Sequence, residues 1–289
     1  MSSRPAIAGK LPLTELGEMK RRGDRIVMVT AYDYPSGRLA DAAGVDLVLV
    51  GDTAAMVVMG YGATVPATME EMLLLTRWVS RGAKRPLVVG DMPFGSYQVS
   101  DELAVENAVR MLKEGGADLV KLEGTGPSLS RVRAISDAGI AVMGHVGLTP
   151  QSATKLGGFK AQGRSAEKAR LLFEDALALQ EAGVSALVLE AVPAEVAADV
   201  TEALSVPTIG IGAGSATDGQ VLVWHDLLGL YEGRSPRFVK RYADVAPVIR
   251  EALEHFVADV RSGSFPEDRH TYAISEDELT RFRKAVRAG

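Results

Sequence analysis

The regular alternation of short apolar segments with helix-type segments is the feature of this chain that most restricts its fold. Each apolar segment resembles a strand buried on both faces, and a glycine commonly ends the helical segment before it. We expect strands at residues 26–33, 46–52, 86–91, 119–124, 140–145, 186–190, 207–214 and 221–225. We expect helices between them at 36–43, 68–81, 100–114, 128–138, 166–182 and 193–204. Eight such units predict an α/β fold, a closed (β/α)8 TIM barrel, and favour it over an open doubly wound sheet.

No linker-like change in composition divides the chain, so we expect a single domain over residues 1–289 with the barrel at about 26–230. One extra helix, at 14–22, precedes the barrel. Residues 245–287 are expected to form two amphipathic helices outside it. The apolar stripe of the first, which includes Val248 and Phe256, suits packing against the barrel wall or a partner subunit.

Composition excludes several classes of protein. The chain has no cysteine, and therefore no disulfide framework, thiol nucleophile or cysteine metal site. Its net charge of −5 argues against a general nucleic-acid surface. Residues 1–5 lack the apolar run of a signal peptide, and no stretch approaches the roughly 20 apolar residues of a membrane span. We therefore expect a cytoplasmic protein with neither nucleic acid nor membrane as a partner.

The strand at residues 119–124 carries two charges in an otherwise apolar run. Lys121 and Glu123 are two positions apart and therefore point to the same face of the strand. A charged pair on a core strand is costly unless something binds it. At the carboxyl end of a barrel strand, a metal or an anionic substrate would do so. A structural ion pair on an edge strand is the alternative.

Charged and polar side chains recur at the carboxyl ends of the expected strands, and we expect no charge at the opposite ends. The set comprises Asp33, Asp52, Asp91, Lys121, Glu123, His145 and Glu190. In a barrel these ends converge on one mouth, where several carboxylates would repel one another unless a cation lay among them. Oxygen ligands without cysteine favour Mg²⁺ over Zn²⁺. Individual members have simpler interpretations: Asp33 suits a turn in which its side chain accepts backbone N–H bonds, and His145 could lie in a tight turn.

The sequence leaves the roles of two glycine-containing segments open. The run at residues 210–214 permits either close approach to a ligand or tight packing. The segment 146–164 is long for a strand-to-helix connection and suits a lid over the mouth, with a disordered insertion as the alternative.

Several ordered segments resemble the ketopantoate (3-methyl-2-oxobutanoate) hydroxymethyltransferase family of pantothenate synthesis. They are TAYDYPSGRLAD (30–41), LVGDTAAMV (49–57), GDMPFGSY (90–97), VKLEG (120–124), GHVGLTPQS (144–152), GGFKAQGR (157–164), VLEAVP (188–193) and IGIGAGSATDGQVLVWHD (209–226). The family is similar to the phosphoenolpyruvate/pyruvate barrel enzymes. The resemblance implies transfer of a one-carbon unit from 5,10-methylenetetrahydrofolate to 3-methyl-2-oxobutanoate, a 2-oxo acid, and a homo-oligomer, commonly a decamer.

The resemblance also implies a role for each matching residue. Asp52, Asp91 and Glu123 would surround Mg²⁺. The oxo acid would contact Thr53, Asp91 and Lys121, and Glu190 would carry the proton. His145 is a supporting residue. The family motif usually has serine where this chain has Thr53, which keeps the hydroxyl but crowds the pocket with a methyl group.

Two other functions stay open at this stage. A lyase or mutase on the same barrel would also use Mg²⁺ and an enolate, but the VKLEG and GHVGLTPQS segments argue against it. A non-catalytic metal- or metabolite-binding barrel is the third reading, and the complete set of carboxylates with Lys121 argues against it.

Overall fold

The computed structural model describes residues 9–152, 158, 160–230, 233 and 236–287. The chain divides into two compact units, Met1–Tyr242 and Ala243–Gly289, and each is described by itself. The single domain over residues 1–289 stays a prediction. No helix in the described part of the chain is long and apolar enough to cross a membrane.

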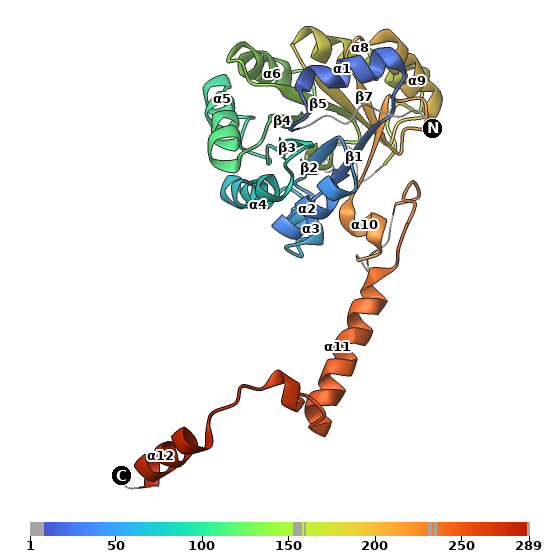
Figure 1. Ribbon diagram of the computed structural model, residues 1–289. Coiled ribbons are helices and arrows are strands. Elements are labelled where there is room, and N and C mark those ends of the chain that lie inside the picture. Colours follow the sequence, from blue (N-terminus) through green and yellow to red (C-terminus); the bar gives the residue numbers. More distant parts are fainter. Residues whose placement is uncertain (1–8, 153–157, 159, 231–232, 234–235, 288–289) are drawn as a thin grey trace. The chain divides into compact units, whose positions relative to one another are not determined.

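The first unit is a closed barrel of parallel strands (Figure 1). Neighbours along the chain pair with one another, and the last strand pairs back with the first. The strands are β1 Ile26–Thr30, β2 Leu47–Val50, β3 Leu87–Asp91, β4 Leu119–Glu123, β5 Val142–Gly147, β6 Ala186–Glu190, β7 Thr208–Ile211 and β8 Gly219–Leu222. The predicted (β/α)8 TIM barrel is confirmed. Because the barrel is closed, Lys121 and Glu123 do not lie on an edge strand.

Helices surround the barrel (Figure 1). They are α1 Leu13–Arg22, α2 Tyr34–Ala42, α3 Ala54–Val57, α4 Met69–Gly82, α5 Asp101–Arg110, α6 Ser128–Asp137, α8 Ala166–Glu181, α9 Ala194–Ala203 and α10 Trp224–Leu228. A π-helix, η1 Met111–Gly115, continues α5, and a short 3-10 turn, η2 Pro150–Ser152, follows β5. Side-chain caps fix several starting points; α4, for example, begins at a capping box between Thr68 and Glu71.

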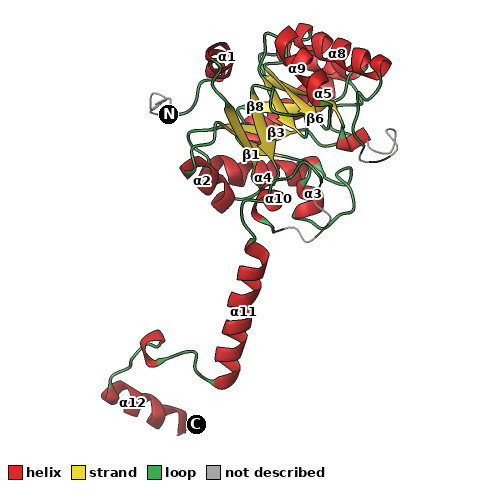
Figure 2. Ribbon diagram, turned by 90° about the vertical axis from the view of Figure 1, so that its right-hand side faces the viewer, coloured by secondary structure: helices red, strands yellow, loops and turns green. Residues whose placement is uncertain are grey.

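Alternation along the strands separates two apolar clusters. Val120 and Leu122 of β4 belong to the cluster between the strands and the helices, whereas Leu119 belongs to the cluster inside the barrel. Lys121 and Glu123 therefore face the barrel interior, on the same side as Leu119. The interior cluster also contains Leu16 of α1, so this helix covers the amino-terminal end of the barrel. Figure 2 shows α1 and α10 toward opposite ends of the strands.

The amino ends of the strands carry buried or half-buried aspartates, so the expectation that these ends are uncharged was wrong. Each aspartate accepts the N–H of a neighbouring strand: Asp46 from Val27 (2.9 Å), Asp118 from Val88 (2.7 Å) and Asp218 from Thr208 (2.8 Å). Lysines complete two of these sites, since Lys20 Nζ lies 2.8 Å from Asp218 and Lys10 Nζ 2.6 Å from Asp118. These carboxylates satisfy backbone donors at the start of the strands, where the neighbouring strand offers no acceptor.

The eighth strand lies earlier than predicted. Trp224 and His225, expected in this strand, instead begin helix α10. The strand starts at Gly219, where an added Cβ would lie 2.5 Å from the Ile26 carbonyl oxygen, so glycine permits β8 to approach β1 and close the barrel. The Trp224 N–H then leaves the strand ladder and donates to Thr30 Oγ1 at 2.8 Å.

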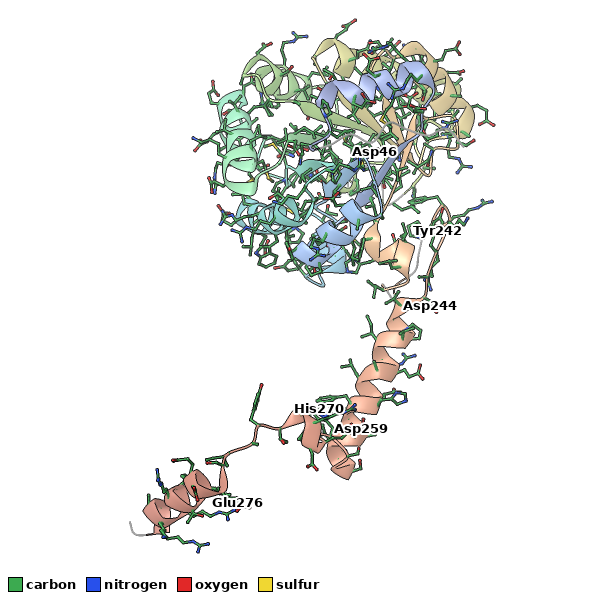
Figure 3. All side chains as sticks on the ribbon, in the orientation of Figure 1. Asp46, Tyr242, Asp244, Asp259, His270 and Glu276 are labelled. Carbon is green, nitrogen blue, oxygen red and sulfur yellow. The ribbon has the colours of Figure 1, made fainter. Side chains whose placement is uncertain are left out.

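The second unit contains α11 Val245–Ser262, η3 Asp268–His270 and α12 Glu276–Arg287, which agrees with the two helices expected at 245–287. The chain turns back after α11, near Asp259 (Figure 3). At this turn the Ser264 N–H donates to the Asp259 carbonyl at 3.0 Å. The Phe265 ring lies 5.7 Å from the Phe256 ring and 5.1 Å from the His270 ring, measured between centroids. These contacts hold η3 against the end of α11.

Candidate active site

Side chains from four adjacent strands form a continuous charged row inside the carboxyl end of the barrel. Lys121 Nζ lies 2.7 Å from Asp91 Oδ1 and 3.7 Å from Glu123 Oε1. His145 Nδ1 lies 3.6 Å from Glu123 Oε1, and its Nε2 lies 3.3 Å from Glu190 Oε2. Four of these residues are fully buried, and the Glu190 side chain is 16% exposed. The structure thus brings five of the predicted site residues together.

Asp52 and Thr53 join this row from the loop after β2. The Asp52 N–H donates to Asp91 Oδ2 at 3.0 Å, which ties the loop after β2 to the end of β3. The Thr53 hydroxyl lies 2.8 Å from the hydroxyl of buried Tyr32. Thr53 stands where the family motif usually has serine, and its hydroxyl is therefore held in a fixed position at the mouth of the barrel.

Gln151 was not predicted as a site residue, yet it organises the carboxylates. Its Nε2 donates to Asp52 Oδ2 (3.0 Å) and to the Met92 carbonyl (2.9 Å), and its N–H donates to Glu123 Oε2 (2.9 Å). Its Oε1 accepts a 2.7 Å bond from the Tyr97 hydroxyl. Only the segment GHVGLTPQS signalled this residue in the sequence, because all its partners are distant along the chain.

Burial and mutual charge decide the protonation of the row. Burial alone would lower the pKa of Lys121, but Asp91, Glu123 and Asp52 outweigh it and raise that pKa, so the ammonium stays charged. Burial raises the pKa of Asp52, and the charges of Asp91 and Glu123 raise it further. Burial also raises the pKa of Asp91, against the opposing effect of Lys121. For Glu123, His145 and Lys121 overcome the effect of burial and lower the pKa.

His145 is held between two carboxylates. Burial would lower the pKa of its imidazole, but contacts with Glu123 and Glu190 reverse this and raise the pKa to about 9. Both ring nitrogens are buried, and neither makes a hydrogen bond of normal geometry with the described residues. The ring is therefore a charged link between Glu123 and Glu190 rather than a neutral residue in a tight turn.

The chemistry of the oxygen atoms fits the hard cation expected from the sequence. Hydrogen bonds hold Asp52 Oδ2, Asp91 Oδ2 and Glu123 Oε2. In contrast, Asp91 Oδ1 and Glu123 Oε1 are buried and accept no hydrogen bond of normal geometry from the described residues, although Asp91 Oδ1 forms the 2.7 Å ion pair with Lys121 Nζ. The carboxylates of Asp52, Asp91, Glu123 and Glu190 outnumber the cations Lys121 and His145, which leaves an excess of negative charge that a divalent cation neutralises. Among the described residues, no three His, Asp or Glu side chains are arranged as a complete set of metal ligands. The type of donor atom therefore supports a cation here, and the ligand geometry does not.

A small inner cavity of about 50 Å³ lies within this network. Its walls differ in character around the barrel. The charged side comprises Asp52, Asp91, Lys121, Glu123, His145 and Glu190 from β2 to β6. The opposite side is mainly apolar, with Ile211, Val221 and Val223 from β7, β8 and the segment after it. A small molecule bound here would place its anionic or polar end on one wall and its hydrocarbon on the other.

Backbone geometry fixes the position of Glu190. Gly147 and Glu190 pair across β5 and β6, and a Cβ at Gly147 (φ 97°) would lie 2.2 Å from the Glu190 carbonyl oxygen. Ala191, the next residue, adopts φ 50°, an uncommon conformation for a residue with a side chain. Its carbonyl accepts the Gln162 N–H at 3.0 Å. Local strain of this kind is typical of functional sites.

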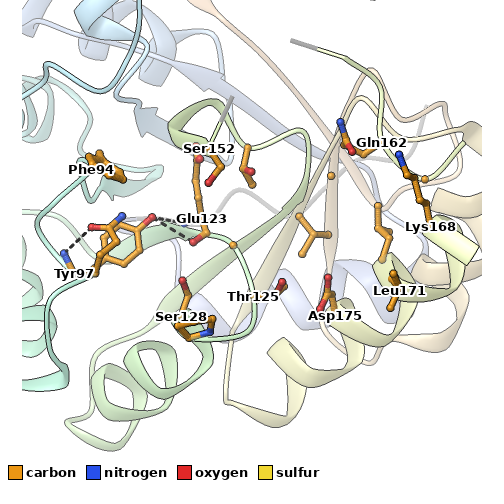
Figure 4. Close-up of a pocket in the computed structure, with 18 residues that line it drawn as sticks. Phe94, Tyr97, Glu123, Thr125, Ser128, Ser152, Gln162, Lys168, Leu171 and Asp175 are labelled. Atoms are coloured by element: carbon orange, nitrogen blue, oxygen red, sulfur yellow. Dashed lines mark hydrogen bonds between the residues drawn. The ribbon is translucent and has the colours of Figure 1, made fainter. Parts of the chain in front are cut away.

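A larger cavity of about 620 Å³ lies beside the mouth (Figure 4). Glu123 and Tyr97 lie toward one end of it, and Gln162 and Lys168 lie toward the other (Figure 4). Of the charged row, only Glu123 lines this cavity. The larger cavity is therefore a neighbour of the candidate active site and does not contain its charged groups.

The structure describes Asp33, the glycines after β7 and part of the segment 146–164, for which the sequence left more than one role open. Asp33 is exposed and caps α2 by accepting the Ser36 N–H at 2.7 Å, as its turn interpretation predicted, so it lies outside the charged row. The glycines after β7 serve packing, because added Cβ atoms would lie 2.6 Å from the Phe238 ring at Gly212 and 2.5 Å from Ala194 Cβ at Gly214. The expected lid at 146–164 falls partly on residues 153–157 and 159, which lie outside the described residues.

Comparisons with known proteins give matches over most of the chain. A model of the ketopantoate hydroxymethyltransferase family matches residues 10–268. Two relatives, both named 3-methyl-2-oxobutanoate hydroxymethyltransferase, come from Moorella thermoacetica and Carboxydothermus hydrogenoformans. The first is 57% identical over 263 residues, which are 91% of this chain and 98% of that protein. The second is 52% identical over 272 residues, which are 94% and 99% respectively.

Solved structures with a similar fold include 2,3-dimethylmalate lyase, with a TM-score of 0.57 at 17% identity and 93% of both chains covered. A phosphonopyruvate hydrolase in complex with oxalate and Mg²⁺ has a TM-score of 0.56 at 13% identity and covers 96% of both chains. At these identities the likeness concerns the barrel fold alone.

The raised pKa of His145 predicts a pH-dependent contribution to stability in metal-free protein. A group whose pKa rises from 6.5 to about 9 on folding stabilises the fold fully below pH 6.5 and loses this contribution as the pH rises through about 9. The free energy of unfolding with chelator present should fall over this window, by on the order of 1–3 kcal/mol more than in His145→Gln. Exposed His255→Gln is the control. Parallel curves for the unmodified protein and His145→Gln would contradict the assignment.

Proposed function

The chain belongs to the ketopantoate hydroxymethyltransferase family, and from this premise we propose how its barrel mouth performs the transfer. The chain is an enzyme, a hydroxymethyltransferase of the kind that acts in pantothenate biosynthesis. We propose that the inner cavity binds 3-methyl-2-oxobutanoate and that 5,10-methylenetetrahydrofolate supplies the one-carbon unit, giving 2-dehydropantoate. One observation carries this proposal: buried Lys121 and partly exposed Glu190 line the same small cavity. Glu123 and His145 lie between them and link them. A cytoplasmic location stays a prediction.

Bond formation at C3 of the oxo acid first requires removal of a weakly acidic proton. The proton lies next to a ketone, so negative charge develops on the keto oxygen as it leaves. The Lys121 ammonium is buried and held by Asp91, and it stabilises that charge without reorganisation. Glu190 is the partly exposed carboxylate of the cavity and accepts the proton. His145 orients this carboxylate from its other side.

The three carboxylates Asp52, Asp91 and Glu123 would hold Mg²⁺. A bound divalent cation supplies Lewis acidity toward the keto and carboxylate oxygens of the oxo acid. Gln151 donates hydrogen bonds to one oxygen of Asp52 and one of Glu123, which leaves their other oxygens for the ion. The Thr53 hydroxyl, fixed by Tyr32, lines the same cavity and contacts the oxo acid.

The nucleophilic C3 then attacks the one-carbon unit, which the folate carries at the oxidation level of formaldehyde. Water supplies the hydroxyl oxygen of the product, and tetrahydrofolate leaves. A lyase or mutase on the same barrel is disfavoured because the relatives with more than half of their residues identical carry the hydroxymethyltransferase name.

The cation site is tested with Asp52→Ala, Asp91→Ala and Glu123→Ala. Each change removes one charged oxygen ligand from a hard-cation site. The affinity for Mn²⁺, measured by electron paramagnetic resonance as a Mg²⁺ substitute, should fall more than about tenfold, because the loss of even an outer-shell partner costs 10–100-fold. Activity should require added Mg²⁺ after treatment with chelator. Exposed Glu195→Gln is the control, and unchanged Mn²⁺ affinity in two of the three variants would show that the site is misplaced.

Glu190→Gln keeps the size of the side chain but cannot accept a proton. General-base catalysis contributes roughly 10²–10⁴-fold, so turnover should fall by about that factor. Binding of the oxo acid, measured by calorimetry, should change little. The direct measurement is exchange of the C3 proton of 3-methyl-2-oxobutanoate in D₂O without folate. If the variant exchanges this proton as fast as the unmodified enzyme, another group is the base, and His145 is the first candidate.

We also propose a homo-oligomer, with the decamer as the expected state. The supporting observation is the apolar face of α11, on which Ile249, Leu253 and Val260 are exposed. A helix with such a face needs a partner surface to bury it. Light scattering at micromolar concentration should give a mass well above that of a dimer. A monomeric mass would contradict the proposal, and Leu253→Glu should reduce the mass if α11 forms the contact.

A further inference from the structure

A second cavity adjoins the inner cavity on the side of Glu190. Its volume is about 540 Å³, within the range of small-molecule sites. Both cavities are lined by Thr53, Pro150, Glu190, Ile211 and Val223. In contrast, the cavity of Figure 4 shares only Glu123 with the inner cavity. Among the cavities formed by the described residues, the second cavity is therefore the one that gives a larger molecule direct access to Glu190.

The inner cavity, with a volume of about 50 Å³, is too small to hold the one-carbon donor together with the oxo acid. The one-carbon donor must nevertheless place its carbon next to C3 of the oxo acid. At the wall that both cavities share, near Glu190 and Thr53, the donor can reach C3 of the oxo acid without entering the inner cavity. The second cavity, whose wall is mainly apolar with Met56, Val57 and Phe238, suits flat ring systems.

Polar groups of this cavity match a pterin donor in their chemistry. Thr64 Oγ1 is buried and has no hydrogen-bond partner among the described residues, so it is left for a ligand. Asp226 on α10 lines the cavity, and its carboxylate can accept the paired N–H donors of an aminopyrimidine ring. Lys160 and Arg237 are exposed cations of the same lining and can pair with the carboxylates of a glutamate tail.

We propose that this cavity, lined by Thr64, Asp226, Arg237 and Phe238, is the binding site of the pterin-carrying one-carbon donor. Asp226 recognises the aminopyrimidine ring, and Lys160 and Arg237 recognise the glutamate tail. The assignment rests on the proposed function, since it takes Glu190 as the group that removes the C3 proton. It adds the residues that bind the second substrate.

The experiment separates donor binding from the chemistry at C3. Three enzymes are compared with the unmodified one: Asp226→Asn, Arg237→Gln and Lys168→Gln, the last being a control in the cavity of Figure 4. For each, the KM for 5,10-methylenetetrahydrofolate, the KM for the oxo acid and the folate-independent exchange of the C3 proton are measured. The exchange rate also shows that a variant is folded.

We expect Asp226→Asn to raise the donor KM at least about tenfold, because it weakens a hydrogen bond to a charged group, while C3 exchange stays within about twofold. Arg237→Gln should raise the donor KM less when the donor lacks its glutamate, that is, with the methylenetetrahydropteroate analogue. Unchanged donor KM in both variants, or a raised donor KM in Lys168→Gln alone, would overturn the assignment. If Asp226→Asn does not fold, the exposed Arg237→Gln decides alone.

Absence of C3 exchange in the unmodified enzyme would contradict the proposed function instead. The two failures are therefore distinguishable, because one concerns the donor KM and the other concerns a reaction that needs no donor.

Discussion

The buried ammonium of Lys121 is the constraint on which the rest of the site depends. A charge inside a barrel is tolerated only when opposite charges lie within a few ångströms. Strand register supplies them, because Asp91 pairs with Lys121 across β3 and β4, and Glu123 pairs with His145 across β4 and β5. Gly147 and Glu190 pair in the same way across β5 and β6. The charged row therefore follows from the register that the barrel needs for closure.

The two ends of the barrel use carboxylates for different purposes. At the amino end, Asp46 and Asp218 accept hydrogen bonds from backbone N–H groups, and Asp218 also pairs with Lys20. These aspartates stabilise the start of the strands. At the carboxyl end, one buried oxygen of Glu123 accepts no hydrogen bond of normal geometry from the described residues, and the corresponding oxygen of Asp91 lies 2.7 Å from the Lys121 ammonium. Carboxylates are thus structural at one end of the barrel and reactive at the other. The difference lies in which hydrogen-bond donors the neighbouring strand provides.

The sequence predicted the barrel and the charged mouth because both depend on local patterns. Apolar runs and glycines locate strands and helices, and residues such as Asp52 and Glu190 stand where those runs end. The rest depended on partners far apart along the chain. Gln151 binds residues from three other segments, Asp218 binds a strand that precedes it, and the glycines after β7 pack against Phe238. The end of β8 was misplaced because its apolar run continues into α10.

The division of the inner cavity into a charged wall and an apolar wall affects how such an enzyme can diverge. The charged wall is built from strands whose side chains depend on one another, so a single substitution there disturbs several partners. Ile211, Val221 and Val223 on the other wall take no part in that network. Mutations at these three positions can reshape the pocket around the hydrocarbon part of a substrate while the reactive groups stay in place. Evolution, or a laboratory selection for new 2-oxo acids, would therefore proceed along the apolar wall.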